Sequence, residues 1–237
     1  MKDAVLFDLG GTLISYYEKG QFAGILEQAI AEVSHYLQDQ ELLVGYQEEV
    51  NRRVKEENYE ASDYQVRPLE ERLARIFQLE SKNTDEAVKI EMCRRFMQPV
   101  FALAYLYEET LPTLRELRAR GYQTAIITNT PWGSPGTLWL EEIERHGLST
   151  WVDGIVCCRD AGWRKPARQV FEYTLQRLQL TPECCLFVGD DPRWDIVGPR
   201  NIGIEAILLD RAGKMKDTRE ETIRTLDELW ERLEVDK

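Results

Sequence analysis

The stretch AVLFDLGGTL, residues 4–13, decides how this chain folds. Its first four residues are apolar without polar alternation, which is typical of a strand buried on both faces of a parallel sheet. The run ends abruptly at the carboxylate of Asp8. We therefore expect a central strand that carries an acidic side chain at its carboxyl end.

Further along the chain, short apolar runs with polar endings recur. Residues 125–127 end at Thr128 and Asn129, and residues 154–158 end at Arg159 and Asp160. Residues 185–188 end at Gly189, Asp190 and Asp191, and residues 205–209 end at Asp210. Apolar stripes of helical period lie between them, formed by Leu111, Leu114 and Leu117 before Gly121, and by Val170, Thr174, Leu175 and Leu178. Strands that alternate with helices predict βαβ units and a doubly wound α/β fold with a parallel sheet. Thr225 and Glu228 have the spacing of a capping box, which predicts a last helix through Leu233.

Residues 16–107 have a different pattern, with helical periodicity and no convincing strand. Two apolar stripes of helical period are formed by Phe22, Leu26, Ala29, Ile30, Val33 and Leu37, and by Leu69, Leu73, Ile76 and Phe77. A third helix is expected to start at Thr84, because Asp85 and Glu86 favour a helix N-terminus. We therefore expect an α/β core of residues 1–15 and 108–237 that is interrupted by an all-helical domain, residues 16–107.

Composition and charge exclude several classes of protein. The net charge of −12 over 237 residues argues against non-specific nucleic-acid binding, because little would neutralise a run of phosphates. No apolar run reaches the length of about 18 residues that spans a membrane, and the first apolar run is too short for a signal peptide. The adjacent cysteines, Cys157 with Cys158 and Cys184 with Cys185, lie in apolar runs and are expected to be buried and reduced. We expect a cytoplasmic protein without a membrane partner.

The polar strand endings point to chemistry at one edge of the sheet. In an open α/β sheet, ligands bind at the carboxyl ends of the strands near the switch in strand order. The side chains expected to converge there are Asp8, Thr128, Asn129, Asp190 and Asp191, with Lys165 on a nearby loop. Crowded carboxylates need a cation, and Mg²⁺ prefers hard oxygen ligands together with a substrate phosphate. A metal, an ammonium and a hydroxyl around one free carboxylate are suited to phosphoryl transfer.

These residues resemble the haloacid dehalogenase superfamily of hydrolases. Asp8 to Leu13 are similar to its first motif, Thr128 to the second, Lys165 before Pro166 to the third, and Gly189 and Asp190 with Asp195 to the fourth. The resemblance implies a Rossmann-like core with a helical cap, and a small phosphorylated substrate, because a cap closes over the cleft. It also implies that Asp8 is a nucleophile, which forms an aspartyl-phosphate.

The resemblance assigns the remaining site residues as well. Mg²⁺ would be held by Asp8, the backbone carbonyl of Gly10, and Asp190, with Asp191 and Asp195 acting through water or through other ligands. Lys165 would keep Asp8 ionised and neutralise developing charge, while Thr128 and Asn129 would bind the phosphate. Gly11 and Thr12 would shape the turn that aims Asp8.

Gly10 departs from the family pattern, because phosphatases of the family usually carry a second aspartate there that acts as acid and base. General acid–base catalysis contributes about 10²–10⁴-fold, so its loss matters. The alternatives are therefore a phosphonate hydrolase, a haloacid hydrolase, or a catalytically weak relative that binds a metabolite or a protein. A phosphonate hydrolase would need a cap lysine, and Lys55 is the candidate by position. Its run of charges, residues 52–57, is more typical of a solvated helix face.

Outside the motifs, a few side chains are candidates for substrate contact. Tyr16, Tyr17 and Arg67 belong to the predicted helical domain or its edge, and Trp132 closely follows the predicted phosphate-binding residues. The two histidines, His35 and His146, lie in helical stretches away from every motif and are expected to be structural.

Overall fold

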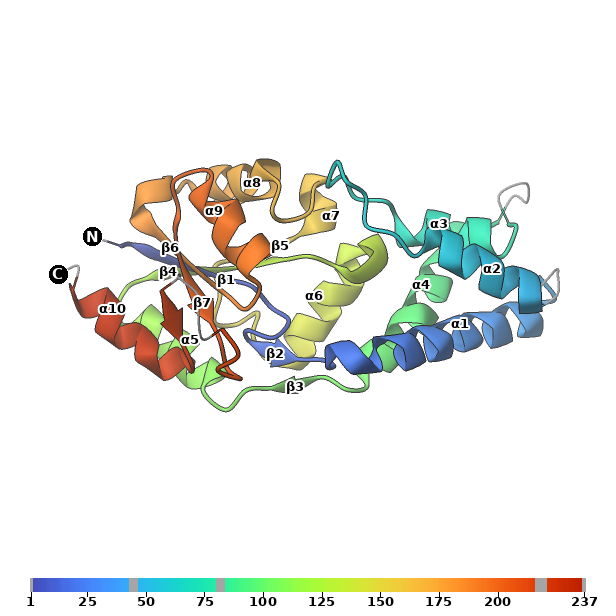
Figure 1. The fold of residues 1–237 in the computed structure, drawn as a ribbon, viewed down its shortest axis with the longest axis horizontal. Helices are drawn as coiled ribbons and strands as arrows, with labels where there is room; N and C mark the ends of the chain where they lie inside the picture. Colours follow the sequence, from blue (N-terminus) through green and yellow to red (C-terminus); the bar gives the residue numbers. More distant parts are fainter. Residues whose placement is uncertain (1, 43–46, 80–83, 216–220, 236–237) are drawn as a thin grey trace.

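The apolar runs of the sequence form one six-stranded sheet. The computed structural model describes residues 2–42, 47–79, 84–215 and 221–235. The strand order is β5-β4-β1-β6-β7-β8, and every neighbouring pair is parallel. The strands are β1 (Ala4–Phe7), β4 (Gln123–Thr128), β5 (Gly154–Cys157), β6 (Cys185–Gly189), β7 (Glu205–Leu209) and β8 (Thr222–Ile223), shown in Figure 1. The predicted doubly wound α/β fold is confirmed.

Helices cover both faces of this sheet, which is why β1 is apolar throughout. One face is covered by α5 (Thr110–Ala119), α6 (Gly136–Arg145) and α10 (Leu229–Val235), and the other by α8 (Arg168–Leu178) and α9 (Gly198–Arg200) (Figure 1). Val5 and Phe7 pack in the core on the α5 side, whereas Ala4 and Leu6 pack in the core on the α8 side. All four side chains are fully buried. The buried strand β1 therefore holds Asp8 firmly at the carboxyl end of the sheet.

A helical insertion extends from one end of the sheet (Figure 1). Its helices are α1 (Phe22–Asp39), α2 (Gln47–Glu57), α3 (Leu69–Ile76) and α4 (Glu86–Phe101). The long helices α1 and α4 pack against each other, and α3 packs on both α2 and α4. Both predicted apolar stripes lie in this packing, with Val33, Leu37, Leu69 and Leu73 fully buried. The predicted division between residues 15 and 16 and between 107 and 108 stays a prediction.

Three local predictions were wrong. The region expected to be free of strands contains β3 (Tyr105–Leu106), which pairs antiparallel with β2 (Ile14–Ser15) where the insertion leaves the core. Helix α4 begins at Glu86 rather than at Thr84, because the Asp85 side chain accepts a hydrogen bond from the backbone N–H of Ala87. The capping box does not form, since Thr225 makes no side-chain cap and Glu228 instead accepts from the backbone N–H of Arg224.

The remaining elements are short. They are η1 (Lys19–Gln21), η2 (Pro131–Gly133), α7 (Cys158–Ala161), η3 (Pro182–Cys184), the π-helical turn η4 (Pro192–Val197) and η5 (Leu226–Glu228). All five cysteines are free thiols, and four of them are buried. Among the described helices, none has the length and apolar character needed to cross a membrane.

Candidate active site

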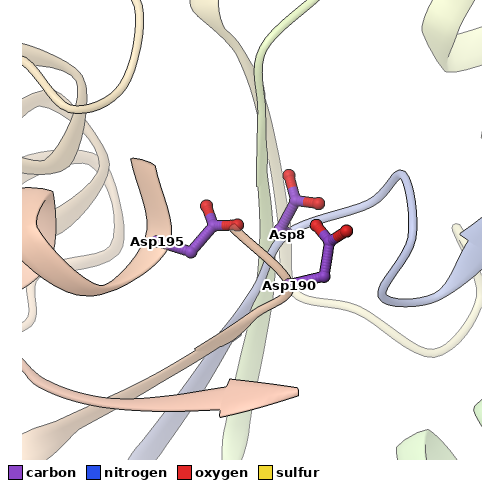
Figure 2. Close-up of side chains that lie close together, drawn as sticks. All are labelled: Asp8, Asp190 and Asp195. Atoms are coloured by element: carbon purple, nitrogen blue, oxygen red, sulfur yellow. The ribbon is translucent and has the colours of Figure 1, made fainter. Parts of the chain in front are cut away.

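Three aspartates meet at the carboxyl edge of the sheet. Asp8 follows β1, Asp190 follows β6, and Asp195 lies in η4. One carboxylate oxygen from each lies within 4.8 Å of the other two, as Figure 2 shows. Asp8 and Asp195 are buried, whereas solvent in the cleft reaches Asp190. Oxygen ligands at this spacing are suited to a hard divalent cation.

The turn after Asp8 is set by the space around Asp190. Gly11 has a φ of +85°, and a Cβ at this position would lie 2.3 Å from Oδ2 of Asp190. Only glycine tolerates both this backbone conformation and this close approach. The chain then turns back at Thr12, whose hydroxyl donates to Oδ2 of Asp8 at 3.4 Å. The turn at Gly11 and the hydrogen bond from Thr12 therefore together orient the Asp8 side chain.

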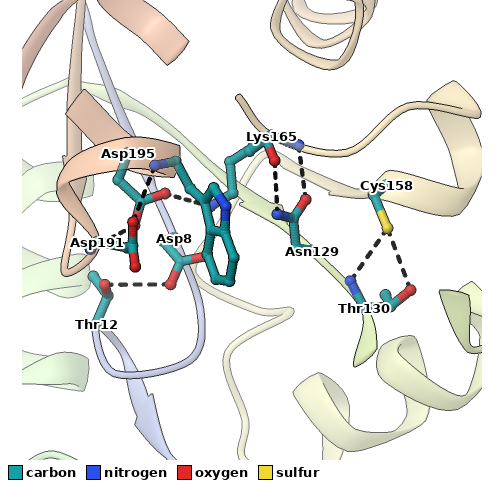
Figure 3. A network of polar contacts seen from close by, with 9 residues as sticks. Asp8, Thr12, Asn129, Thr130, Cys158, Lys165, Asp191 and Asp195 are labelled. Atoms are coloured by element: carbon teal, nitrogen blue, oxygen red, sulfur yellow. Dashed lines mark hydrogen bonds and ion pairs between the residues drawn. The ribbon is translucent and has the colours of Figure 1, made fainter. Parts of the chain in front are cut away.

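Lys165 joins two of the three aspartates. Its ammonium donates to Oδ1 of Asp8 and to Oδ1 of Asp195, at 2.6 Å each, and only 1% of its side chain is exposed. Asn129 fixes the backbone of Lys165 in two directions, accepting from its N–H at 2.8 Å and donating to its carbonyl at 3.1 Å (Figure 3). Asn129, predicted to bind substrate, thus has a positioning contact that the sequence did not reveal.

The crowding of charge shifts the pKa of several of these groups. Although one side of Asp190 meets solvent in the cleft, the protein packed around its carboxyl group raises the pKa to about 8, and the negative charges of Asp8 and Asp195 act in the same direction. Burial also raises the pKa of Asp195, against the attraction of Lys165. Burial alone would lower the pKa of the Lys165 ammonium, but the negative charges of Asp195 and Asp8 hold this pKa above its usual range. The cluster therefore carries more negative charge than one lysine compensates.

Asp191 and Asp195, which were predicted to act together, lie in different surroundings. The Asp191 carboxylate caps η4, accepting from the backbone N–H groups of Arg193 and Trp194 at 2.9 and 3.2 Å. The Asp195 carboxylate instead reaches the metal-competent cluster and accepts from the backbone N–H of Asp191 at 3.0 Å (Figure 3). Side-chain caps are common at helix N-termini, and the Asp-Pro sequence at residues 191–192 was the signal for one here.

A cleft of about 640 Å³ lies between these residues and the helical insertion. It is lined by Asp8, Gly10, Gly11, Tyr16, Tyr17, Phe22, Asn58, Tyr59, Glu60, Val100, Thr128, Asn129, Pro131, Trp132, Trp139, Arg164, Asp190 and Trp194. The volume is in the usual range for small-molecule sites. The predicted Thr128 and Asn129 thus open on the same cleft as Asp8.

The ring of Tyr16 lies beside Gly10. A Cβ built on Gly10 would be 3.4 Å from Cδ2 of Tyr16, so a side chain there would press against the ring. Tyr16 is held from behind by an edge-to-face contact with Trp139, with ring centroids 5.5 Å apart. Burial, followed by the charges of Glu142 and Asp8, raises the pKa of the Tyr16 hydroxyl, which therefore stays protonated at neutral pH. The small residue at position 10 is matched by a large one at position 16.

The other candidates from the sequence divide into two groups. Tyr17 and Trp132 line the cleft, and the Trp132 ring also packs 5.2 Å from the ring of Phe96 in the insertion. Arg67 does not line it, because its guanidinium pairs with Asp63 at 2.8 Å. Lys55 is exposed on α2 and is absent from the cleft lining.

The charged run on α2 and the two histidines do not line the cleft. Lys55 fits the predicted solvated face, but Arg53 in the same run is buried and donates to the carbonyl of Ile76 at 3.0 Å. His35 is exposed on α1, and His146 contacts Glu142 at 3.0 Å. The cleft residues that sequence reasoning missed include Tyr59, Arg164 and Trp194. Only Arg164 had a sequence signal, its position next to Lys165.

Comparison with known proteins places this geometry in a family. The family model of haloacid dehalogenase-like hydrolases matches residues 2–203. A ribulose-1,5-bisphosphate 5-phosphatase from Halopiger xanaduensis is 30% identical over 215 residues, which cover 89% of this chain and 85% of that protein. The solved structure of a HAD phosphatase from Thermococcus onnurineus is 27% identical, with a TM-score of 0.67 and 98% of both chains covered. A 2-haloacid dehalogenase from Pseudomonas syringae shares the fold, with a TM-score of 0.70 at 23% identity over 100% of both chains.

The chain belongs to the haloacid dehalogenase-like hydrolase family, and it is a hydrolase. Within that family its relatives include proteins named as phosphatases, such as the Halopiger protein and a glyceraldehyde 3-phosphate phosphatase from Methanothermobacter thermautotrophicus. The second match, 34% identical, spans 46% of each chain. The membership expected from the four motifs is confirmed.

Proposed function

We propose that this protein is a Mg²⁺-dependent phosphatase that uses Asp8 as nucleophile and hydrolyses a small phosphorylated metabolite in the cytoplasm. The observation that supports it best is the contact of buried Lys165 with Asp8 and Asp195, beside Asp190 and at the floor of a cleft. A ribulose-1,5-bisphosphate 5-phosphatase and a phosphoserine phosphatase among the relatives both act on small phosphate esters, which agrees with a cleft of this size.

The donor set fits Mg²⁺. The carboxylates of Asp8 and Asp190, with the backbone carbonyl of Gly10, would hold the ion, and Asp195 lies close enough to take part. Burial and mutual repulsion raise the pKa of Asp190 in the metal-free site, so a bound cation would relieve an existing electrostatic cost. When bound, Mg²⁺ would supply positive charge between the anionic nucleophile and the anionic phosphate.

The residues of the chain would carry out the chemistry in two steps. An oxygen of Asp8 attacks phosphorus, the bond from phosphorus to the leaving oxygen breaks, and an aspartyl-phosphate forms. Water then attacks this phosphorus and releases inorganic phosphate, regenerating Asp8. Lys165 keeps Asp8 ionised and neutralises developing charge, and Asn129 holds Lys165 in place through its backbone. Thr128 lies at the end of β4 in the cleft lining, where its hydroxyl would bind a phosphate oxygen.

Because residue 10 is glycine, no carboxylic acid at this position can protonate the oxygen of the leaving group. The proton for that oxygen must come from water or from another donor, so substrates with a good leaving group should react fastest. The ring of Tyr16 lies next to position 10, in contact range of the Cβ that an aspartate there would carry.

Two alternatives are weaker. A phosphonate hydrolase would need a lysine over the nucleophile, but Lys55 is exposed and does not line the cleft. A binding protein without catalysis would have no need for a buried lysine that contacts both Asp8 and Asp195. A haloacid hydrolase remains the alternative that Gly10 itself favours, and haloacids are therefore included in the test.

The test is release of phosphate from p-nitrophenyl phosphate, with Mg²⁺ or with a chelator. We expect Mg²⁺-dependent turnover, and a loss of at least about 1,000-fold in the variant Asp8→Asn, which keeps the shape but removes the nucleophile. The matched control is Asp39→Asn, an exposed position at the end of α1, which should leave turnover unchanged. Brief incubation and acid quench should show a phosphate mass added to the peptide that contains Asp8.

The outcomes separate the candidate functions. Turnover that survives in Asp8→Asn would contradict the mechanism. Halide release from 2-haloacids, in chelator and without phosphate release from any ester, would favour the haloacid hydrolase. Phosphate release with Mg²⁺ that disappears in Asp8→Asn would support the phosphatase and justify a screen of phosphorylated metabolites.

A further inference from the structure

Some buried polar atoms without a hydrogen-bond partner belong to residues that line the cleft. In the part of the chain that the structure describes, such side-chain atoms are Tyr16 Oη, Arg72 Nε, Thr113 Oγ1, Arg164 Nε and Trp194 Nε1. Tyr16, Arg164 and Trp194 line the cleft directly. A buried donor left without a partner costs about 1–3 kcal/mol, so several at one site call for an explanation. A ligand with acceptor oxygens would provide one.

Arg164 is the charged member of this group. Its backbone is fixed, because its N–H donates to the carbonyl of Tyr64 at 2.8 Å and Lys165 follows it directly. Its guanidinium has no carboxylate partner among the described residues. Nearby arginines of the same interface differ, since Arg159 pairs with Glu70 at 2.6 Å and Arg193 pairs with Glu60 at 3.2 Å. An unpaired guanidinium in a cleft wall is suited to binding a carboxylate or a phosphate.

Arg72 adds a second positive charge behind this wall. Its residue is 3% exposed, and its guanidinium donates only to backbone carbonyls, those of Glu57 and Tyr59. It lies over the rings of Tyr59 and Trp132, at 4.7 and 5.6 Å from their centroids, and both rings line the cleft. The Arg72 guanidinium therefore lies directly behind two aromatic side chains of the cleft wall.

The acidic side chains at the cleft have partners of their own. Glu60 also lines the cleft, but its carboxylate is paired with Arg193. Asp8 and Asp195 contact Lys165, and on the proposed function Asp8 and Asp190 would hold Mg²⁺ beside the transferred phosphate. A cleft of about 640 Å³ leaves room for a leaving group beside that phosphate.

We propose that Arg164, supported by Arg72, binds a second anionic group on the leaving group of the substrate. The substrate is then a phosphate monoester whose leaving group carries a carboxylate or a second phosphate. This inference rests on the proposed phosphatase function and deepens it by naming the substrate class. Arg164 contacts the end of the substrate that does not react, so it determines specificity.

The experiment compares substrates that differ only in the second anion. The first pair is 3-phosphoglycerate and glycerol 3-phosphate, and the second is fructose 1,6-bisphosphate and fructose 6-phosphate. In one of the two pairs, we expect wild type to prefer the compound with the second anion, 3-phosphoglycerate or fructose 1,6-bisphosphate. The preference in kcat/KM should be about 10–100-fold, which corresponds to one charge-assisted contact. The first pair reports a carboxylate and the second a phosphate.

Variants at Arg164 connect that preference to the residue. In Arg164→Gln we expect the preference to fall to less than about threefold, mainly through KM, and in Arg164→Lys we expect part of it to return. The matched control is Arg168→Gln, which removes an exposed arginine paired with Glu172 and should keep the wild-type preference. Thermal melting of each variant reports whether the fold is kept.

The two proposals fail in different ways. If wild type hydrolyses both members of each pair equally well, or if Arg164→Gln keeps the preference, the anion subsite is wrong while the phosphatase function stands. If no ester releases phosphate with Mg²⁺, the proposed function is wrong and the subsite falls with it.

Discussion

Replacing Lys165 by methionine tests the charge balance of the site most directly. The substitution Lys165→Met keeps the length of the side chain and removes the ammonium that donates to Asp8 and Asp195 at 2.6 Å. Both carboxylates are buried, and the lysine side chain is 1% exposed, so water cannot take its place. The variant therefore leaves two buried negative charges close together, with Asp190 beside them.

The size of the effect follows from these contacts. Removing one partner of a buried ion pair costs about 3–5 kcal/mol. For a chain of this length, each kcal/mol lowers the melting temperature by about 2–4 °C, so we expect a fall of roughly 6–20 °C in chelator. Mg²⁺ should recover part of this loss and should stabilise the variant more than it stabilises wild type. Phosphate release should fall by at least about 100-fold, since on the proposed mechanism the lysine would also neutralise developing charge.

The assay is differential scanning calorimetry at pH 7, in chelator and with Mg²⁺, together with phosphate release. The control Lys89→Met removes a half-buried lysine that pairs with the exposed Glu86, and it should change the melting temperature by less than about 2 °C. A melting temperature of Lys165→Met within 2 °C of wild type in chelator would refute the view that Lys165 compensates buried charge.

Three further predictions concern the same edge of the sheet. Gly10→Asp should raise the hydrolysis of an aryl phosphate by about tenfold, less than the full 10²–10⁴-fold of an acid–base group because Tyr16 crowds the new side chain, whereas Gly10→Ala should give no gain. In chelator, the free energy of unfolding should fall as the pH rises from 4 to 8. The pKa of Asp190 is raised to about 8, so in this range the folded state keeps a proton that the unfolded state has lost. Denaturant titration at several pH values will measure the trend. Asp191→Ala should cost about 1 kcal/mol of stability through its lost cap, yet calorimetric titration should still detect Mg²⁺ binding.

The sequence predicted the sheet and the residues at its edge because both follow from local rules. A run of four apolar residues that ends in Asp8 can only be buried on two faces, and parallel strands bring their ends together. What could not be predicted depends on three-dimensional neighbours. The amide of Asn129 meets Lys165 across 36 positions of sequence, and Tyr16 meets Gly10 only after the chain turns back. The choice between Asp191 and Asp195 required the geometry of η4.

The positive wall of the cleft was missed for a related reason. Arg164 lies next to a motif residue, but its significance is the absence of a partner among the described residues, which no linear pattern reveals. In the insertion, periodicity indicated which faces are buried and failed at the ends, where the choice between Thr84 and Asp85 as cap depends on a single side-chain rotamer.

The central position of β1 has a consequence for biosynthesis. Residues 4–7 are translated well before the strands that flank them, residues 123–126 and 185–188. At 5–20 residues per second, the strand that carries Asp8 waits roughly 10–35 s for its second neighbour. Until then the apolar side chains of β1 lack the neighbours that bury them in the folded protein. The carboxylate of Asp8 is therefore made long before those of Asp190 and Asp195, so the cluster of three aspartates can assemble only after residue 195 has been synthesised.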